Sequence, residues 1–233
     1  MKNKILVIGA GSWGTAIADI LAKKNKSVDI WTRNIKISDE INNKNTNKKY
    51  FKKIKLQKNL NSISGAFDTS QYSYIFYVLP AGQFEHFINN YLINQKINNF
   101  TICSKGLSTN GQLISVVAKA YLKFKNLYIL SGPSFAEEVI KGLPTALSVS
   151  SNSSPLPLGK LFKGTNIRIY YSKNYKTLEV LGVIKNIYAI GAGIIDALSL
   201  GENARAAYIA RCIAEIQFIL KNSKFDNKQI LTL

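Results

Sequence analysis

Along most of the chain, short apolar runs alternate with segments that have helical spacing. Runs suited to buried strands occupy residues 5–8, 27–31, 74–80, 100–106, 127–135, 145–151 and 166–172. Helical spacing follows several of them, at residues 15–24, 83–92 and 112–124. Alternation of this kind is typical of a doubly wound α/β domain with a parallel sheet. The pattern therefore predicts a Rossmann-type fold, in which ligands bind at the carboxyl ends of the strands.

The pattern changes near residue 177. Residues 178–200 are apolar almost all the way round a helix, and residues 203–220 form a second long helical segment. A helix that is apolar on every side is expected to be buried on every side. We therefore expect two units: residues 1–177 as a dinucleotide-binding Rossmann domain, and residues 178–233 as part of an all-α substrate domain.

The first apolar run ends in GAGSWG, residues 9–14, which leads into a helix. In such a strand–turn–helix unit, Gly9, Gly11 and Gly14 permit a tight turn, close approach of the backbone to a pyrophosphate, and close packing of helix on strand. The N-terminus of the helix then offers free N–H groups to the phosphates. The segment predicts a dinucleotide site; the alternative is that the glycines serve a turn alone.

The end of the second strand reads WTRN, residues 31–34. Rossmann units that prefer NAD usually place an acidic residue here to hold the ribose hydroxyls. In this chain Arg33 stands near the position, and Asp29 lies too early, inside the strand. Because an arginine tolerates or favours a 2′-phosphate, the expected cofactor is NADPH or NADH, with NADP accepted. The alternative is that Arg33 is an ordinary surface charge.

Composition excludes several kinds of chemistry. The 233 residues include a single histidine, His86, and two cysteines, Cys103 and Cys212, which are far apart and lack metal-ligand spacing. We expect no metal site, and reduced cysteines indicate a cytoplasmic protein. His86 falls in a helical segment, where we expect it to be exposed to solvent. No apolar stretch reaches about 18 uninterrupted residues, so no membrane span is expected.

The formal net charge of +18 comes mainly from lysine, with 27 lysines against 4 arginines. Seven of the lysines lie between residues 43 and 58. Nucleic-acid-binding proteins usually show arginines for phosphate and base contacts and aromatic residues for stacking. Dispersed lysines instead predict a solvated surface that attracts small anionic substrates, so no specific nucleic-acid partner is expected.

One lysine interrupts an apolar stretch. Lys185 and the adjacent Asn186 lie within LGVIKNIYAIGAGI, residues 181–194. Burial lowers the pKa of a lysine, and a lysine that titrates near neutrality is a useful general acid and base. Asn186 offers both a donor and an acceptor to substrate oxygens. The alternative is a lysine whose stem packs while its ammonium reaches the surface.

Six segments together resemble bacterial NAD(P)-dependent glycerol-3-phosphate dehydrogenase, and they run in that family's order over nearly the whole chain. They are GAGSWGTAIA (9–18), KGL (105–107), GPSFAEEV (132–139), LPTA (143–146), IKNIYAIGAG (184–193) and ENARAAYIAR (202–211). The resemblance implies an oxidoreductase that interconverts dihydroxyacetone phosphate, a small phosphorylated substrate, and sn-glycerol 3-phosphate by hydride transfer with NAD(P)H. The product would feed glycerophospholipid synthesis.

The resemblance also implies roles for individual residues. Lys185 matches the catalytic lysine, which accepts the proton when glycerol 3-phosphate is oxidised. The substrate contacts that it implies are Lys105, Gly132 and Ser134, to which the amide chemistry of Asn186 adds a fourth. Beside the three glycines of the turn, the implied cofactor contacts are Ser12, Trp13, Arg33, Tyr50, Lys105 and Ala136.

The family continues well past the position that corresponds to Leu233, with further residues that hold the substrate phosphate and the cofactor. We therefore expect a chain shortened before the family's C-terminal third. In such a chain, apolar faces at Ile187, Ile194 and Ile213 would lack cover and favour association, so the chain could form a homodimer. The alternative function is a dinucleotide-binding remnant without turnover.

Overall fold

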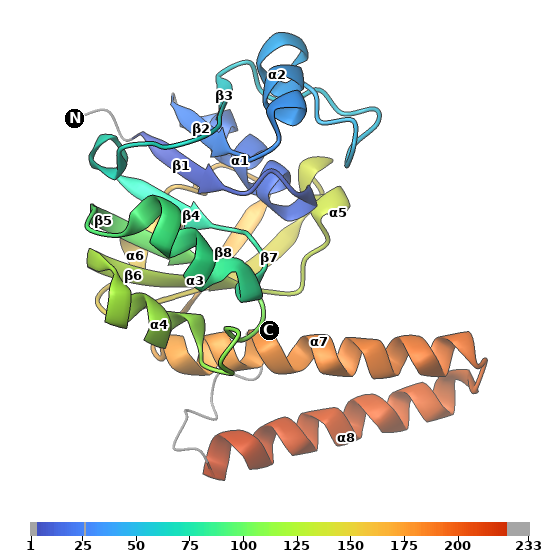
Figure 1. The fold of residues 1–233 in the computed structure, drawn as a ribbon. Helices are drawn as coiled ribbons and strands as arrows, with labels where there is room; N and C mark the ends of the chain where they lie inside the picture. Colours follow the sequence, from blue (N-terminus) through green and yellow to red (C-terminus); the bar gives the residue numbers. More distant parts are fainter. Residues whose placement is uncertain (1–3, 26, 223–233) are drawn as a thin grey trace.

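The computed structural model describes residues 4–25 and 27–222, so the last residues of the predicted second unit lie outside the described part. Strands and helices alternate as far as residue 172, and two long helices follow (Figure 1). The strands are β1 (Ile5–Ile8), β2 (Val28–Trp31), β3 (Leu60–Ile63), β4 (Tyr74–Tyr77), β5 (Lys96–Ile102), β6 (Lys123–Ser131), β7 (Thr145–Ser151) and β8 (Ile167–Ser172). The α-helices are α1 (Ser12–Lys24), α2 (Ile35–Lys44), α3 (Phe84–Phe87), α4 (Ile114–Tyr121), α5 (Ala136–Ile140), α6 (Leu156–Lys160), α7 (Tyr175–Ala197) and α8 (Gly201–Asn222). Single turns occupy Thr69–Gln71, Ala81–Gln83 and Ile88–Leu92.

The strands form one sheet in the order β3-β2-β1-β4-β5-β6-β7-β8. Neighbouring strands pair parallel except β6 and β7, which pair antiparallel. The predicted doubly wound α/β fold is confirmed, with β7 and β8 running against the other strands. Because β2 lies on one side of β1 and β4 on the other, the strand order reverses at β1. Open α/β sheets bind ligands in the crevice at such a reversal.

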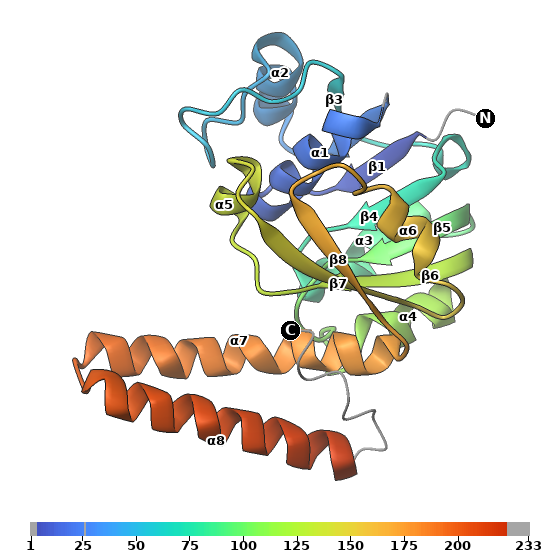
Figure 2. The ribbon, with the colours of Figure 1, turned by 180° about the vertical axis from the view of Figure 1, so that it is seen from behind.

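Helices cover both faces of the sheet (Figures 1 and 2). On one face, α1, α2, α5 and α6 pack against alternate strand residues such as Ile5 and Val7. On the other face, α3, α4 and the first turn of α7 pack on the side of Leu6 and Ile8. β1 is thus buried on both faces, which is why its sequence is a continuous apolar run rather than an alternating one.

The structure contains four elements that the apolar pattern did not predict, namely α2, β3 and the short helices α5 and α6, and it shortens another. α2 and β3 are both rich in polar residues, and α2 begins at the N-cap Asn34, whose side chain accepts a hydrogen bond from the Ile37 N–H. The predicted end of the helix at residue 124 is wrong, since α4 ends at Tyr121. Lys123 and Phe124 pair with β5 instead, as the start of β6. Pairing with a neighbouring strand has overridden local helical spacing there.

α7 and α8 form a helical hairpin that lies along one end of the sheet domain and extends past it (Figures 1 and 2). The first turns of α7 are docked on the sheet domain, with Leu178 and Leu181 buried. The Glu179 carboxylate accepts a hydrogen bond from the backbone N–H of Ser115, at the start of α4, at 2.9 Å. Beyond Gly182 most residues of α7 are exposed or half-buried. The prediction of burial on every side is therefore wrong for the outer part of α7.

The apolar faces expected to lack cover do face solvent, since the exposed fractions of Ile187, Ile194 and Ile213 are 62%, 55% and 44%. Among the described helices, α7 is the one long and apolar enough to cross a membrane. That property is weak evidence, because a helix in a protein core can share it. Here the helix is docked on the sheet through its first turns, and it carries Lys185 near its centre.

Candidate functional site

A pocket of about 800 Å³ opens at the reversal of the strand order. Residues that follow β1, β2, β4 and β5 line it, together with the turn before α5. Most of the predicted cofactor and substrate residues meet in this pocket. They are Gly9, Gly11, Ser12, Trp13, Gly14, Arg33, Tyr50, Lys105, Ser134 and Ala136.

The glycine turn fits a dinucleotide pyrophosphate. A Cβ on Gly14 would overlap the carbonyl oxygen of Gly9, so only glycine allows α1 to pack this closely on the turn. At Gly11 the reverse holds, since nothing lies within 4 Å of where a Cβ would be. The backbone there faces open space at the N-terminus of α1, whose first N–H groups lack intrahelical partners and can bind phosphate.

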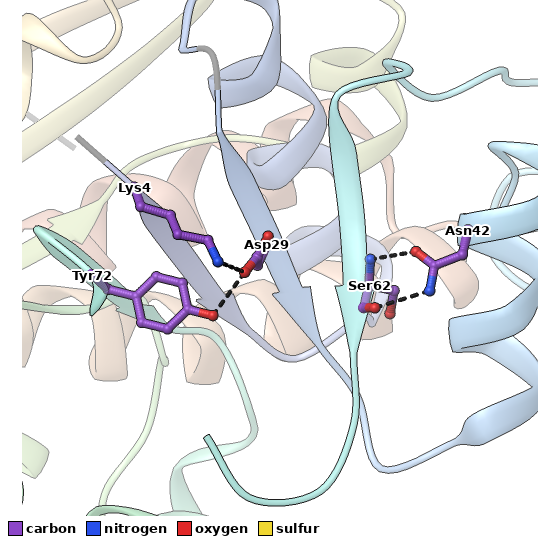
Figure 3. Close-up of polar contacts among 5 residues, drawn as sticks. All are labelled: Lys4, Asp29, Asn42, Ser62 and Tyr72. Atoms are coloured by element: carbon purple, nitrogen blue, oxygen red, sulfur yellow. Dashed lines mark hydrogen bonds and ion pairs between the residues drawn. The ribbon is translucent and has the colours of Figure 1, made fainter. Parts of the chain in front are cut away.

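No aspartate or glutamate is among the pocket-lining residues that the structure describes. Asp29 is buried within β2, where its carboxylate pairs with the Lys4 ammonium at 2.8 Å and accepts a hydrogen bond from the Tyr72 hydroxyl at 2.7 Å (Figure 3). It therefore holds the sheet together and is not free to bind ribose. Arg33 and Tyr50 line the pocket instead, and both are exposed.

An aromatic wall beside the pocket was not predicted from the sequence. Trp31 ends β2, and its ring lies edge-on to those of Phe87 and Tyr91, with centroids 4.9 and 5.0 Å apart. All three residues line the pocket, and flat apolar rings suit the planar adenine of a dinucleotide. The helical spacing of Phe87 and Tyr91 was a signal for this wall, but it indicates a buried helix face equally well. His86 also lines the pocket, and it is exposed as predicted.

Two lysines from different parts of the fold converge on one backbone oxygen. Lys185, from α7, donates to the Gly132 carbonyl at 3.0 Å, and Lys105, after β5, donates to the same oxygen at 3.4 Å. Burial, reinforced by the charge of Lys185, lowers the pKa of Lys105 to about 8. Burial also lowers the pKa of Lys185. Two ammonium groups this close to each other favour an anionic ligand and hold a readily lost proton.

The turn after β6 brings the lysines to the edge of the pocket. A Cβ on Gly132 would lie 2.8 Å from the Ala146 oxygen, so glycine permits the close approach of this turn to β7. Ser134 follows, and its buried hydroxyl has no hydrogen-bond partner among the described residues. Gly132, Lys185 and Asn186 lie outside the pocket lining, the first two linked to it through Lys105. Asn186 is exposed on α7.

Comparisons with known proteins agree with this geometry. Residues 4–156 match the sequence model described as the N-terminus of NAD-dependent glycerol-3-phosphate dehydrogenase. Residues 174–233 match the model described as the C-terminus of the same enzyme. The second match begins one residue before α7, and residues 157–173, which include β8, lie between the two matches.

Individual relatives carry the same description. The chain is similar to glycerol-3-phosphate dehydrogenase (NAD(P)+) of Orientia tsutsugamushi, at 39% identity over 97% of this chain and 70% of the relative. It is 36% identical to the enzyme of that name from Erythrobacter litoralis, over 93% of this chain and 66% of the relative. A crystal structure of glycerol-3-phosphate dehydrogenase from Coxiella burnetii superposes with a TM-score of 0.87 at 30% identity, covering 100% of this chain and 72% of that one. The chain thus spans about two thirds of the length of these relatives.

Proposed function

The chain belongs to the NAD-dependent glycerol-3-phosphate dehydrogenase family, and from that premise we propose how its residues carry out the reaction. The family reaction interconverts dihydroxyacetone phosphate and sn-glycerol 3-phosphate with NAD(P)H, and its product feeds glycerophospholipid synthesis. The observation that carries the proposal is the convergence of Lys105 and Lys185 on the Gly132 carbonyl beside a dinucleotide pocket.

We assign the cofactor to the pocket and the substrate to the two lysines. The glycine turn and the N-terminus of α1 hold the pyrophosphate, Arg33 and Tyr50 lie at the ribose end, and Ala136 and Lys105 lie toward the opposite end. When bound, the dihydronicotinamide supplies the hydride, and the protein orients it. Ser134, with its unpaired buried hydroxyl, is placed to donate to a substrate oxygen.

Proton transfer falls to Lys185 in this assignment. As a protonated ammonium, Lys185 gives its proton to the oxygen that was the substrate carbonyl; in the oxidative direction, neutral Lys185 takes the proton from the hydroxyl. Burial lowers the pKa of Lys185 below its ordinary value, which eases the loss of its proton. Lys105 stays on the same side of the substrate and offsets the charge of the phosphate or of the developing oxyanion.

We further infer a cytoplasmic location and a homodimer. Both cysteines are free thiols in the structure, as in a reducing compartment. The outer part of α7 exposes Ile187, Ile190 and Ile194, at 62%, 67% and 55%, along one side of the helix. Exposed apolar stripes mark protein–protein contacts, and a second copy of the chain would cover this one.

The central experiment compares Lys185→Met with Lys173→Met as a matched control. Both substitutions remove an ammonium, but Lys173 is exposed and lies outside the pocket lining. We expect Lys185→Met to lower the rate of NADPH oxidation with dihydroxyacetone phosphate by about 10²-fold or more, as loss of general acid–base catalysis implies. NADPH affinity, measured by fluorescence titration, should stay within about twofold because the lysine lies outside the pocket lining.

Two outcomes would overturn parts of this proposal. A Lys185→Met protein that keeps the turnover of the Lys173→Met control would show that the buried lysine is structural. An unmodified chain that binds NADPH with no turnover at all would support the alternative function, a dinucleotide-binding remnant. Neither outcome would change the family to which the chain belongs.

A further inference from the structure

The lysine-rich loop between α2 and β3 is fastened to the cofactor pocket. Asn47 is fully buried, and its side-chain amide donates to the Ala10 carbonyl at 3.1 Å and to the Thr15 hydroxyl at 2.9 Å. Ala10 belongs to the glycine turn and Thr15 to α1, so this one side chain ties the loop to the pyrophosphate site. The loop position two residues later is Lys49.

Further contacts hold the two ends of the loop. On the α2 side, the Glu40 carboxylate accepts hydrogen bonds from the Thr46 hydroxyl at 2.7 Å and from the Lys48 backbone N–H at 2.9 Å. At the other end, the Gln57 N–H donates to the buried Asp19 carboxylate of α1 at 2.7 Å.

α2 and β3, which flank the loop, are joined to each other. The Asn42 side chain accepts from the Ser62 N–H at 2.7 Å and donates to its carbonyl at 2.9 Å (Figure 3). The loop is therefore an ordered element of the pocket rather than a loose, solvated run of lysines. A side chain on it has a defined place relative to the cofactor.

Within this loop, one lysine differs from the others. Of the seven lysines between residues 43 and 58, all of them described, Lys49 is the one that lines the pocket. Arg33 lines the same pocket from the end of β2, so two cations from separate segments contribute to one lining. The ammonium of Lys49 lies 5.6 Å from the centre of the ring of Tyr50, which also lines the pocket.

Within residues 4–25 and 27–222, neither of these two cations, Arg33 and Lys49, forms an ion pair with a carboxylate. No aspartate or glutamate is among the described residues that line the pocket. The acidic residue nearest in sequence to the ribose position, Asp29, is already paired with Lys4. Two cations without an ion-pair partner in the described part of the chain, in a lining that shows no acidic residue there, favour a ligand that carries negative charge.

We propose that Lys49 is a specificity-determining residue: together with Arg33 it forms a subsite for the 2′-phosphate of NADP(H), so the chain binds NADPH more tightly than NADH. The inference rests on the proposed function, since it assumes that the pocket holds a dinucleotide. NADPH differs from NADH by this one phosphate, and a phosphate dianion between an ammonium and a guanidinium makes charge-assisted hydrogen bonds to both. Lys49 thereby acts on cofactor choice and takes no part in hydride or proton transfer.

The test is a set of equilibrium titrations with NADPH and NADH, followed by cofactor fluorescence. The variants are Lys49→Gln, Lys49→Arg and Lys52→Gln; Lys52 is an exposed lysine of the same loop that does not line the pocket. We expect Lys49→Gln to raise the Kd of NADPH about three- to tenfold and that of NADH by less than about twofold, in line with the loss of one exposed ion pair. Lys49→Arg, which keeps the charge, and Lys52→Gln should leave both constants within about twofold.

Added salt provides a second readout. Raising the ionic strength from about 0.01 M to 0.15 M shortens the Debye length from about 30 Å to about 8 Å, so the preference of the unmodified chain for NADPH should shrink. The preference of Lys49→Gln should shrink less, because it contains one charge pair fewer.

Each other outcome counts against a defined part of the argument. If Lys49→Gln weakens NADPH and NADH equally, or weakens neither, Lys49 does not read the 2′-phosphate. If the unmodified chain binds NADH as tightly as NADPH, the inference about cofactor choice is wrong and the proposed function stands. If the unmodified chain binds neither cofactor, the proposed function is wrong as well.

Discussion

In the eight-stranded sheet, most apolar residues are covered by helices of the same chain, whereas in the α7–α8 hairpin most of them face solvent. Ile75, at the centre of β4, is fully buried, and Ile190, in the outer part of α7, is 67% exposed. Both belong to apolar stretches that look alike in the sequence. The difference lies in the neighbours: each strand has two paired strands or a covering helix, while outer α7 has α8 beside it.

The contrast teaches how the site is divided between the two regions. The cofactor pocket is formed wholly by the buried region, from the ends of β1, β2, β4 and β5 and the loops beside them. Lys185 comes from the hairpin, but from its docked part, three residues after Gly182. The proposed mechanism therefore places the chemistry where the two regions join, and it assigns no role to the outer hairpin.

The largest expected effect tests burial directly. Ile75→Ala should lower the free energy of unfolding by about 3 kcal/mol, since it removes buried methyl groups and leaves a cavity in the sheet core. Ile190→Ala, the same chemical change at an exposed position, should change it by less than about 0.5 kcal/mol. Denaturant unfolding of the two variants measures both values. Equal losses would mean that the outer hairpin is as well covered as the sheet.

The sequence predicted the buried region better than the exposed one, for a physical reason. Parallel strands that are buried on both faces, such as β1, are continuous apolar runs. Such strands can therefore be located in the sequence without knowing which strands they pair with. β3 alternates buried and more exposed positions, two of its four residues are polar, and it lies at the edge of the sheet, so its sequence resembles that of a loop. The exposure of Ile187 could not come from the apolar pattern, because that pattern records what a helix could bury and not what is there to cover it.

The candidate site divides in the same way. The glycine turn was predictable because the packing of α1 leaves no room for a Cβ at Gly14. The position of Lys49 in the pocket was not predictable, because nothing in the local sequence distinguishes it from the other six lysines of this polar loop. Its place in the pocket comes from Asn47, which reaches residues 32 and 37 positions away in the sequence. Long-range polar contacts of this kind are what the pattern of apolar residues does not record.

A smaller effect is expected from pH at the joint between the regions. The pKa of Lys105 is lowered to about 8, first by burial and then by the charge of Lys185. Lys105 is therefore charged below about pH 8 and neutral above it, so affinity for the phosphorylated substrate should fall by up to about tenfold per pH unit above that point. The substrate phosphate itself is already a dianion there, since its second pKa is near about 6. Calorimetric titration with glycerol 3-phosphate between pH 7 and 9.5 measures the curve.

Two variants test whether the hairpin contributes to that curve. Lys105→Arg keeps its charge over the whole range and should remove the part of the fall that the titration of Lys105 causes. Lys185→Met removes the neighbouring charge that lowers the pKa of Lys105, so the midpoint of the fall should move to higher pH. An unchanged midpoint would show that Lys185 of α7 does not alter the pKa of Lys105. The two regions would then be electrostatically independent at this site.

The smallest effect on folding, and the sharpest test of the outer hairpin, comes from the exposed stripe of α7. Ile190 and Ile194 are four residues apart and so lie on one side of the helix. Ile190→Gln combined with Ile194→Gln should change the free energy of unfolding of a single chain by less than about 0.5 kcal/mol, since neither residue is buried. Sedimentation should nevertheless show the unmodified chain as a homodimer and the double variant as a monomer, because the apolar contact between copies is lost. The NADPH affinity of both should agree within about twofold, since the pocket belongs to the other region.

Leu156→Gln on α6, at 52% exposure against 55% for Ile194, removes a comparable apolar surface from the sheet region and should leave the dimer intact. A double variant that still dimerises would place the interface elsewhere, and an unmodified chain that is monomeric at micromolar concentration would show that a second copy does not cover the hairpin.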